Sequence, residues 1–208
     1  MHDQKEIRQL IIIRGAQGSG KSSTAAVWAN WEGSRWYESD QYWEDRNGNY
    51  DYDPDRIAKA YAWCFDMVEA AVRKGVPRVI VSNTFRRAKD VDRYVDLGRK
   101  WGYDVKVYVL AGKHENTHDV PEDVVAKCRA EMEPWFGERL YTTTSQGIRE
   151  LVELYPKYKD VCIMLPDKQE GYDGFPWVAP RPGEAGFSKY ALGESYDEDE
   201  NEDEEEEK

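Results

Sequence analysis

Short apolar runs alternate with amphipathic stretches along the chain up to about Trp135. Residues 10–14, 78–83 and 104–110 form three of these runs, and a shorter one, 35–39, ends at Asp40. Between them, residues 21–30, 55–74, 89–101 and 121–132 repeat apolar positions at helical spacing. Strands that alternate with helices predict an α/β fold with a parallel sheet and right-handed crossovers.

The pattern becomes weaker after Trp135. Residues 147–155 indicate a helix and 160–165 a strand, while 166–193 are rich in glycine and proline and are expected to be irregular. We therefore expect a kinase-type P-loop domain over residues 1–140, an extension over 141–195 that packs on or beside it, and a disordered tail over 196–208.

The P-loop interpretation rests on residues 10–22, LIIIRGAQGSGKS, which match G-x4-G-K-S between a strand and a helix. Glycines let backbone N–H groups converge on phosphate oxygens, and the helix N-terminus favours negative charge. Lys21 is expected to reach the β- and γ-phosphates and Ser22 to bind Mg²⁺. The sequence thus predicts a site for ATP and Mg²⁺, without firmly excluding GTP. Its nucleotide-binding residues are Gly15, Ala16, Gln17, Gly18, Ser19, Gly20, Lys21, Ser22 and Ser23.

Composition indicates the size of the core and the expected location of the protein in the cell. The 208 residues are 40% hydrophobic, with 8 Trp and 14 Tyr, so the chain can bury an α/β core of ordinary size. It shows no membrane span and no signal-peptide pattern at its N-terminus. Cys64, Cys128 and Cys162 form no CxxC motif and are expected to be reduced. These features favour a cytoplasmic protein without a membrane partner, in the host cytoplasm if the source is viral.

The net charge of −12 comes mostly from the tail. Residues 197–208 hold ten acids and one lysine, a net −9, which leaves residues 1–196 at −3. Such a segment repels itself and is expected to be disordered. It acts either as a solubilising tail or as a mimic of nucleic acid that contacts a basic protein surface.

Further motifs narrow the class of P-loop protein. The chain has no NKxD segment of the GTPase kind, and Ser82 and Asn83 stand where a Walker B acid would end the strand. Five segments stand out in order: IIIRGAQGSGKSS, ESDQYW, GNYDYDP, VIVSNT and NTHDVPEDVVAKCRAEMEPW. On these, residues 9–135 resemble the P-loop polynucleotide 5′-hydroxyl kinases of phages and their relatives, including the kinase-like domains of NEDD4-binding proteins.

The resemblance implies roles for particular residues. Asp40 would be the general base that takes the proton of the acceptor hydroxyl, as a carboxylate at this edge of the sheet can do. Asn83 and Thr84 would face the acceptor or hold Asp40 in place, or would simply cap the strand end. Arg86 and Arg87 follow shortly after, and we expect at least one of them to contact a phosphate of a polymeric acceptor.

Two departures from the family concern the lid and the acceptor. The phage enzymes carry an arginine in a lid, the loop before the last helix of the kinase domain. In this chain the corresponding loop, residues 113–119, reads KHENTHD and has no arginine. Lys113, His114 or, on the next helix, Arg129 would take its place. Some relatives have an arginine three residues after the base, where this chain has Trp43. An aromatic ring there suits stacking on a base.

The sequence thus predicts a kinase that phosphorylates a hydroxyl of nucleic acid, foremost a 5′-OH end. Two alternatives stay open: a kinase of a nucleoside, nucleotide, modified base or other small hydroxyl compound, and a nucleotide-binding regulator that has lost activity. The sequence does not define the oligomeric state.

Overall fold

The structure, a computed structural model, describes residues 8–45, 47–114, 120–141 and 147–158. Its centre is a parallel sheet of five strands in the order β2-β3-β1-β4-β5. The strands are β1 (Gln9–Arg14), β2 (Ser34–Tyr37), β3 (Arg78–Ser82), β4 (Asp104–Leu110) and β5 (Arg139–Tyr141). The predicted parallel α/β sheet is confirmed.

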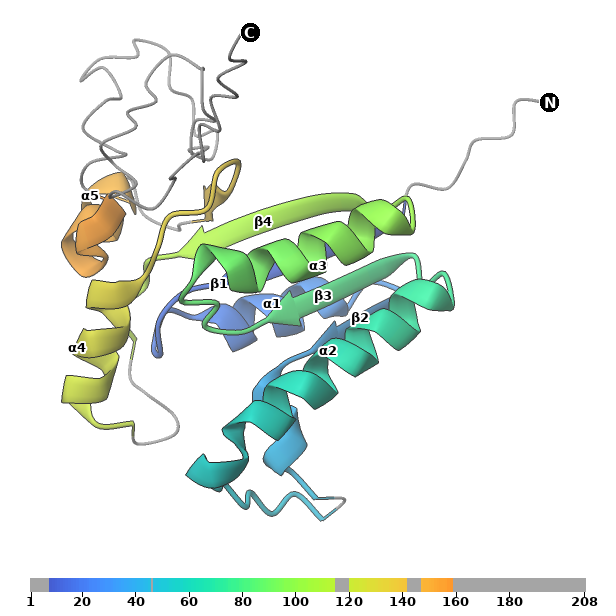
Figure 1. Cartoon of the computed structure of the whole chain (residues 1–208), viewed down its shortest axis with the longest axis horizontal. Helices are drawn as coiled ribbons and strands as arrows, with labels where there is room; N and C mark the ends of the chain where they lie inside the picture. Colours follow the sequence, from blue (N-terminus) through green and yellow to red (C-terminus); the bar gives the residue numbers. More distant parts are fainter. Residues whose placement is uncertain (1–7, 46, 115–119, 142–146, 159–208) are drawn as a thin grey trace, which may run out of the picture.

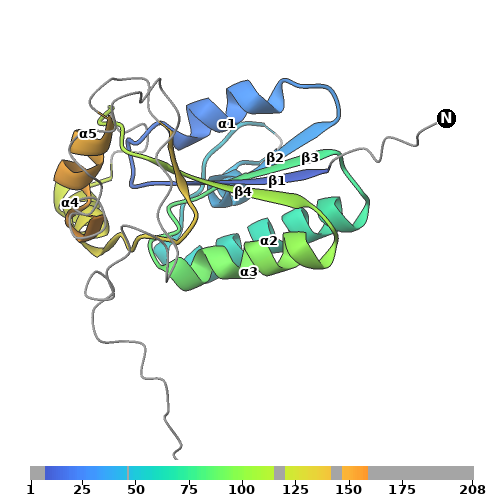
Figure 2. The same ribbon diagram turned by 90° about the horizontal axis from the view of Figure 1, so that it is seen from above.

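Helices cover both faces of this sheet (Figure 2). On one face lies α1 (Lys21–Ala29), and on the other lie α2 (Ile57–Arg73) and α3 (Ala88–Lys100). Two more helices, α4 (Glu122–Glu131) and α5 (Gly147–Leu154), sit beyond the carboxyl ends of the strands (Figure 1). Three short 3-10 turns complete the description: η1 (Ser39–Trp43), η2 (Pro54–Arg56) and η3 (Pro156–Tyr158). The result is a three-layer α/β sandwich.

Strand β1 is buried on both of its faces, as expected for a central parallel strand. Leu10 and Ile12 pack with α2 and α3, whereas Ile11 and Ile13 pack with α1 on the opposite side. A third apolar cluster, at the carboxyl ends of the strands, joins β4 and β5 to α4, α5 and η3. Packing on both faces fixes the position of β1 in the sheet, and with it the point where the P-loop begins.

The structure departs from the predicted elements at two points. Strand β2 ends at Tyr37, and Asp40 lies in the following turn η1 rather than in the strand. Strand β5 was not predicted, because three residues give no readable alternation. The proposed boundary between residues 140 and 141 falls inside β5, and the domain division stays a prediction.

Several expectations concern residues outside the described part of the chain. These are the lid residues 115–119, the strand 160–165, the irregular segment 166–193, the acidic tail and Cys162. Within the described ranges, none of the helices combines the length and the apolar character needed to cross a bilayer.

A close contact between α3 and the sheet provides a first test. A Cβ atom on Gly98 would lie 2.5 Å from Val105 Cγ2 and 2.9 Å from Leu10 Cδ2. In an exposed helix Gly→Ala stabilises by about 1 kcal/mol. Here we expect Gly98→Ala to lower the free energy of unfolding by about 1 kcal/mol, because overpacking outweighs the helix propensity. Urea denaturation measures this value. The exposed Asp96→Ala on the same helix is the control, and a stabilised Gly98→Ala would contradict the close contact.

The two described cysteines provide a second test. Cys64 and Cys128 are free and buried, and burial raises the pKa of the Cys64 thiol to about 11. Because the thiolate is the nucleophile, we expect iodoacetamide at pH 8 to label both very slowly in the native protein and readily in urea. Peptide mass spectrometry reads the labelling. Native Cys64 that reacts as fast as in urea would show that the packing of α2 on β3 is wrong.

Candidate active site

The P-loop adopts a conformation that only glycine accepts at three positions. Gly15, Gly18 and Gly20 have φ angles of 151°, 73° and 90°. A Cβ atom on Gly18 would in addition lie 2.6 Å from the carbonyl oxygen of His114. The backbone conformation of the loop therefore requires glycine at these positions. Gly20 is the N-cap of α1, so the loop continues directly into the N-terminus of this helix.

The polar side chains of the loop suit a bound triphosphate. Lys21 Nζ donates to the carbonyl oxygen of Ala16 at 3.0 Å, and burial lowers the pKa of this lysine. Ser19 Oγ is buried without a hydrogen-bond partner among the described residues, so it has a donor to offer to a phosphate oxygen. Together with the amides at the start of α1, these groups fit the phosphates of a nucleotide.

A pocket of about 780 Å³ opens next to the P-loop. Its lining includes Lys113 and His114 from the start of the predicted lid, Tyr141 from β5, and Glu150 and Glu153 from α5. The His114 amide donates to the carbonyl oxygen of Gly18 at 2.8 Å. The start of the predicted lid is thus attached to the P-loop, and two of the three lid candidates lie at this pocket.

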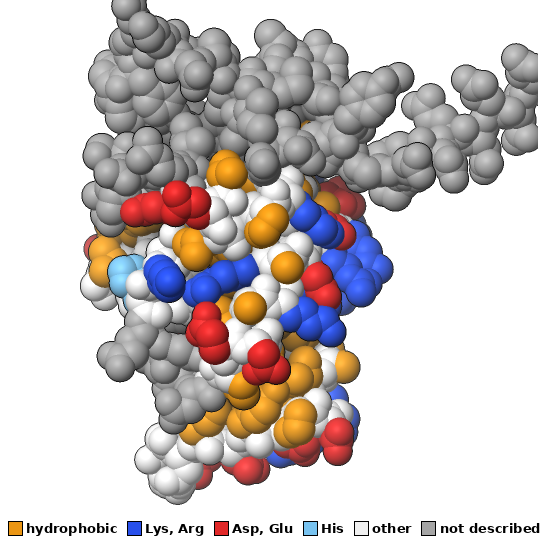
Figure 3. All heavy atoms as spheres, turned by 90° about the vertical axis from the view of Figure 1, so that its left-hand side faces the viewer, with side chains coloured by type: hydrophobic (Ala, Val, Ile, Leu, Met, Phe, Trp, Pro, Cys, Tyr) orange, Lys and Arg blue, Asp and Glu red, His pale blue; other side chains and the backbone are white. Residues whose placement is uncertain are grey.

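A second pocket, of about 560 Å³, is lined by Asp40. It shares Lys21 and Ser22 with the first pocket, so the two cavities meet at the motif that would hold the γ-phosphate. We call it the aromatic pocket because Tyr50, Tyr52 and Tyr61 line it with 40%, 52% and 41% of their surface exposed. Figure 3, which shows the molecule from the left-hand side of Figure 1, has hydrophobic side chains gathered on its lower part, with acidic groups beside them.

Asn83 anchors the turn that carries Asp40. Its Oδ1 accepts the backbone N–H of Ser39 at 2.8 Å, and its Nδ2 lies 3.4 Å from Cys64 Sγ. Asn83 is 3% exposed, so both ends of its amide are used inside the protein. This geometry fits the holding role that the sequence left open. Thr84 also lines the aromatic pocket, together with Tyr61.

Trp43 lies deeper than a stacking surface requires. It lines the aromatic pocket but is only 5% exposed. The rings of Tyr42 and Tyr52 pack edge-on against it, and the Arg56 guanidinium lies 5.6 Å from its centroid. The exposed rings of the pocket are the neighbouring tyrosines, which are better placed to meet an acceptor.

The three predicted arginines have acidic side chains as partners in the structure. Arg86 Nη1 forms an ion pair with Glu131 Oε2 at 2.7 Å, and Arg87 precedes α3, where its amide donates to Asp90 at 3.4 Å. Arg129 Nη1 lies 3.4 Å from Glu122 Oε1 on its own helix. None of these three arginines is among the residues that line the two pockets. Their predicted contacts with acceptor or phosphoryl group stay predictions.

Glu38 is a site residue that the sequence reasoning missed. Its Oε2 accepts hydrogen bonds from Ser22 Oγ at 2.8 Å and from Ser82 Oγ at 2.9 Å. Burial raises its pKa, while these two hydrogen bonds work in the opposite direction. The available signal was the spacing Glu38-Ser39-Asp40, which places two carboxylates after one strand.

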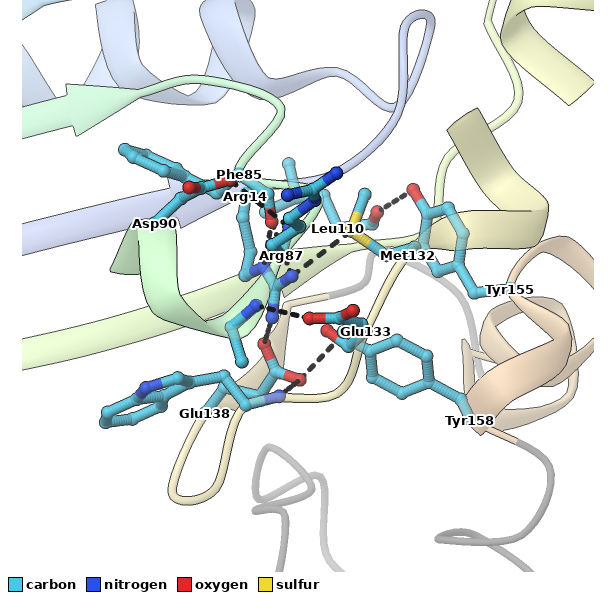
Figure 4. A network of polar contacts seen from close by, with 12 residues as sticks. Arg14, Phe85, Arg87, Asp90, Leu110, Met132, Glu133, Glu138, Tyr155 and Tyr158 are labelled. Carbon is cyan, nitrogen blue, oxygen red and sulfur yellow. Dashed lines mark hydrogen bonds and ion pairs between the residues drawn. The ribbon is translucent and has the colours of Figure 1, made fainter. Parts of the chain in front are cut away.

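Behind the P-loop lies a buried ion pair (Figure 4). Arg14, the last residue of β1, donates from Nη1 to Glu138 Oε2 at 3.1 Å, and both side chains are fully buried. The same guanidinium donates to the carbonyl oxygen of Phe85 and contacts Met132 Sδ at 3.3 Å. Tyr158 Oη lies 2.6 Å from Glu138 Oε1. Arg14 thus joins β1 to the segments before α3 and after α4, and Glu138 extends the network to Tyr158 in η3.

Tyr155 connects the C-terminal part of the described chain to the P-loop itself. Its hydroxyl accepts the backbone N–H of Ala16 at 2.9 Å and donates to the carbonyl oxygen of Leu110 at 2.7 Å. Figure 4 shows the second of these contacts, with Tyr155 projecting from the helical segment toward β4. Residues 147–158 therefore support the nucleotide site, although the sequence predicted them only as an extension.

The sheet order, the glycine cradle and the helix that starts at Lys21 define a P-loop protein of kinase-like fold. A family model described as an AAA domain matches residues 10–115. The chain belongs to this family.

Three similar proteins share 30% identity or less with this chain over the matched residues. Human NEDD4-binding protein 2 is 30% identical over 96 residues, which are 46% of this chain and 5% of that protein. The uncharacterized protein PM0531 of Pasteurella multocida is 28% identical over 131 residues, 57% of this chain and 73% of that protein. A gluconokinase structure from Sinorhizobium meliloti covers 74% of this chain and 94% of its own, with 15% identity and a TM-score of 0.47. The chain thus spans a small fraction of the human relative.

The buried pair supplies a test of how the site is held. We expect Glu138→Gln to lower the free energy of unfolding by about 3–5 kcal/mol, because it leaves the Arg14 charge buried without a counter-charge. Glu131→Gln is the matched control, since it removes an ion pair in which both side chains are 39% exposed. Chemical denaturation compares the two. Equal, small losses would show that Arg14 does not depend on Glu138.

Proposed function

We propose that this protein is an ATP-dependent kinase that transfers the γ-phosphate to a hydroxyl group, with Asp40 as the general base. The observation that carries the proposal is the junction of the two pockets. The pocket next to the P-loop, which would hold the nucleotide, and the aromatic pocket share Lys21 and Ser22, and Asp40 lines only the aromatic pocket. A hydroxyl held beside Asp40 would lie next to the place of the γ-phosphate, as in-line transfer requires.

The chemistry follows from these groups. Asp40 would take the proton of the acceptor hydroxyl as its oxygen attacks phosphorus and the bond to the β-phosphate breaks. Lys21 would neutralise charge on the phosphates. Mg²⁺, held by Ser22 when the nucleotide is bound, would screen the charge that develops on the leaving group.

The lining of the aromatic pocket bears on the acceptor. Three exposed tyrosine rings offer stacking surfaces for a planar base, worth about 1–3 kcal/mol per base in single-strand binders. This favours a nucleoside 5′-hydroxyl, and the predicted 5′-OH end of DNA or RNA is our first candidate acceptor.

A specific observation favours a second candidate, a free nucleoside or another small uncharged hydroxyl compound. Among the described lining residues of the aromatic pocket, Lys21 is the single cation, beside the carboxylates of Glu38 and Asp40. The lid residues 115–119 add no lysine or arginine, and Arg86 is paired with Glu131. A strand carries a phosphate next to its first nucleoside, and this lining offers it little counter-charge.

Label transfer from γ-labelled ATP tests the proposal. The acceptors are 5′-OH oligonucleotides of DNA and RNA and the free nucleosides. We expect Asp40→Asn to slow transfer by at least about 10²-fold, because the general base is lost. ATP binding, measured by calorimetry, should be nearly unchanged. The exposed Asp66→Asn on α2 is the matched control and should retain full transfer.

The outcomes separate the candidates. Transfer to oligonucleotides selects the first candidate acceptor, and transfer to nucleosides alone selects the second. Normal transfer by Asp40→Asn would remove that residue as the base. Nucleotide binding without transfer to any acceptor would favour the alternative of a nucleotide-binding regulator that has lost kinase activity.

A further inference from the structure

The carboxyl end of β3 lacks the acidic residue that P-loop enzymes use at their metal. In these enzymes Mg²⁺ is held by the serine or threonine of the loop and by an aspartate at the end of a neighbouring strand. Strand β3 neighbours β1, and its last residue, Ser82, pairs in register with Ile13, two residues before Gly15. Ser82 and the following Asn83 carry no charge.

A carboxylate from the next strand reaches this position. Glu38 follows β2, and its Oε2 lies within hydrogen-bond distance of Ser22 Oγ and Ser82 Oγ. The three oxygen atoms thus come from the start of α1 and the ends of β2 and β3. They bring one negative charge to the hydroxyl that the motif provides for the metal.

Ser82 is oriented for this contact. Its Oγ accepts a hydrogen bond from Trp36 Nε1 at 2.8 Å, and its own proton is donated to Glu38 Oε2. The backbone of Glu38 is held separately, because its carbonyl oxygen accepts the Gln41 amide at 3.2 Å. Ser82 therefore acts as a positioning residue for the Glu38 carboxylate.

We infer that Glu38 replaces the missing acid and stabilises the Mg²⁺ of the bound nucleotide. The inference rests on the proposed function, which supplies the nucleotide. Oxygen donors of this kind suit Mg²⁺, which prefers one or two protein ligands together with phosphate oxygens. In the described ranges no three His, Cys, Asp or Glu side chains are grouped closely enough to hold a metal. The ion would accordingly bind with the nucleotide and not before it.

The assignment divides the work between two carboxylates that lie two residues apart. Glu38 contacts Ser22 and would act on the metal side, whereas Asp40 has the acceptor hydroxyl as its proposed partner. Ser22 Oγ can give a lone pair to the metal while it donates its proton in a hydrogen bond to Glu38, because a hydroxyl is both donor and acceptor. The hydrogen bond seen in the structure is thus compatible with a bound ion.

Nucleotide affinity with and without metal tests the inference. The probe is the non-hydrolysable β,γ-imido analogue of ATP, measured by calorimetry in Mg²⁺ and in EDTA. We expect Glu38→Gln to reduce the enhancement of affinity by Mg²⁺ at least about tenfold, as for other groups that support a metal ligand. In EDTA the variant should bind the analogue as tightly as the wild type or more tightly, because a carboxylate near the phosphates is removed. Glu32→Gln, exposed and remote from the pockets, is the control.

A second variant guards against a folding defect. Ser82→Ala keeps the Glu38 charge but removes the hydroxyl that positions it, and it should lose part of the Mg²⁺ enhancement. Manganese paramagnetic resonance gives a direct reading, since Glu38→Gln should bind less Mn²⁺ in the presence of the analogue.

Two results would overturn the inference: an unchanged Mg²⁺ enhancement in Glu38→Gln, or equal weakening in Mg²⁺ and in EDTA, which indicates a merely structural residue. Both leave the proposed function intact if the wild type still transfers phosphate. A wild type that binds no nucleotide in either condition would remove the proposed function and this inference together.

Discussion

The buried charge of Arg14 is the constraint on which the site depends. A guanidinium without water must find a counter-charge and acceptors inside the protein. Glu138 and the Phe85 carbonyl supply them, and Arg14 is the residue directly before Gly15. The P-loop therefore begins at a point fixed by segments far apart in the sequence. A substitution of Glu138 would thus change the position of the P-loop backbone after Arg14.

The two pockets adjoin because the strands that lead to them are neighbours in the sheet. Strand β1 ends in the P-loop, and its neighbour β3 ends in Ser82 and Asn83. Asn83 in turn holds the turn η1, and with it Asp40, against the sheet. Parallel strands bring these ends to one edge of the sheet, so the P-loop and the turn that carries Asp40 line the same pocket.

Local signals were enough for four of the five strands, the helices and the nucleotide motif, but not for the three-residue strand β5. Apolar runs such as 10–13 and the glycine spacing of the P-loop are properties of neighbouring residues, and the sequence shows them directly. Glu38 and Glu138 could not be found in this way. Each owes its role to partners 16 to 124 residues away, and an isolated glutamate gives no sign of them. The exposure of Tyr50 and Tyr61 was equally hidden, because aromatic residues alone do not indicate whether they line a pocket or a core.

The sharing of Lys21 and Ser22 by both pockets has a consequence for inhibitor design. If the proposed function holds, a single molecule that joins adenosine to an acceptor ring through a chain of phosphates would fill both cavities at once. Linking the halves makes the second binding event intramolecular, so the joined compound should bind about 10²–10⁴ times more tightly than either half. The length of the phosphate chain that binds best would then serve as a ruler for the distance between donor and acceptor.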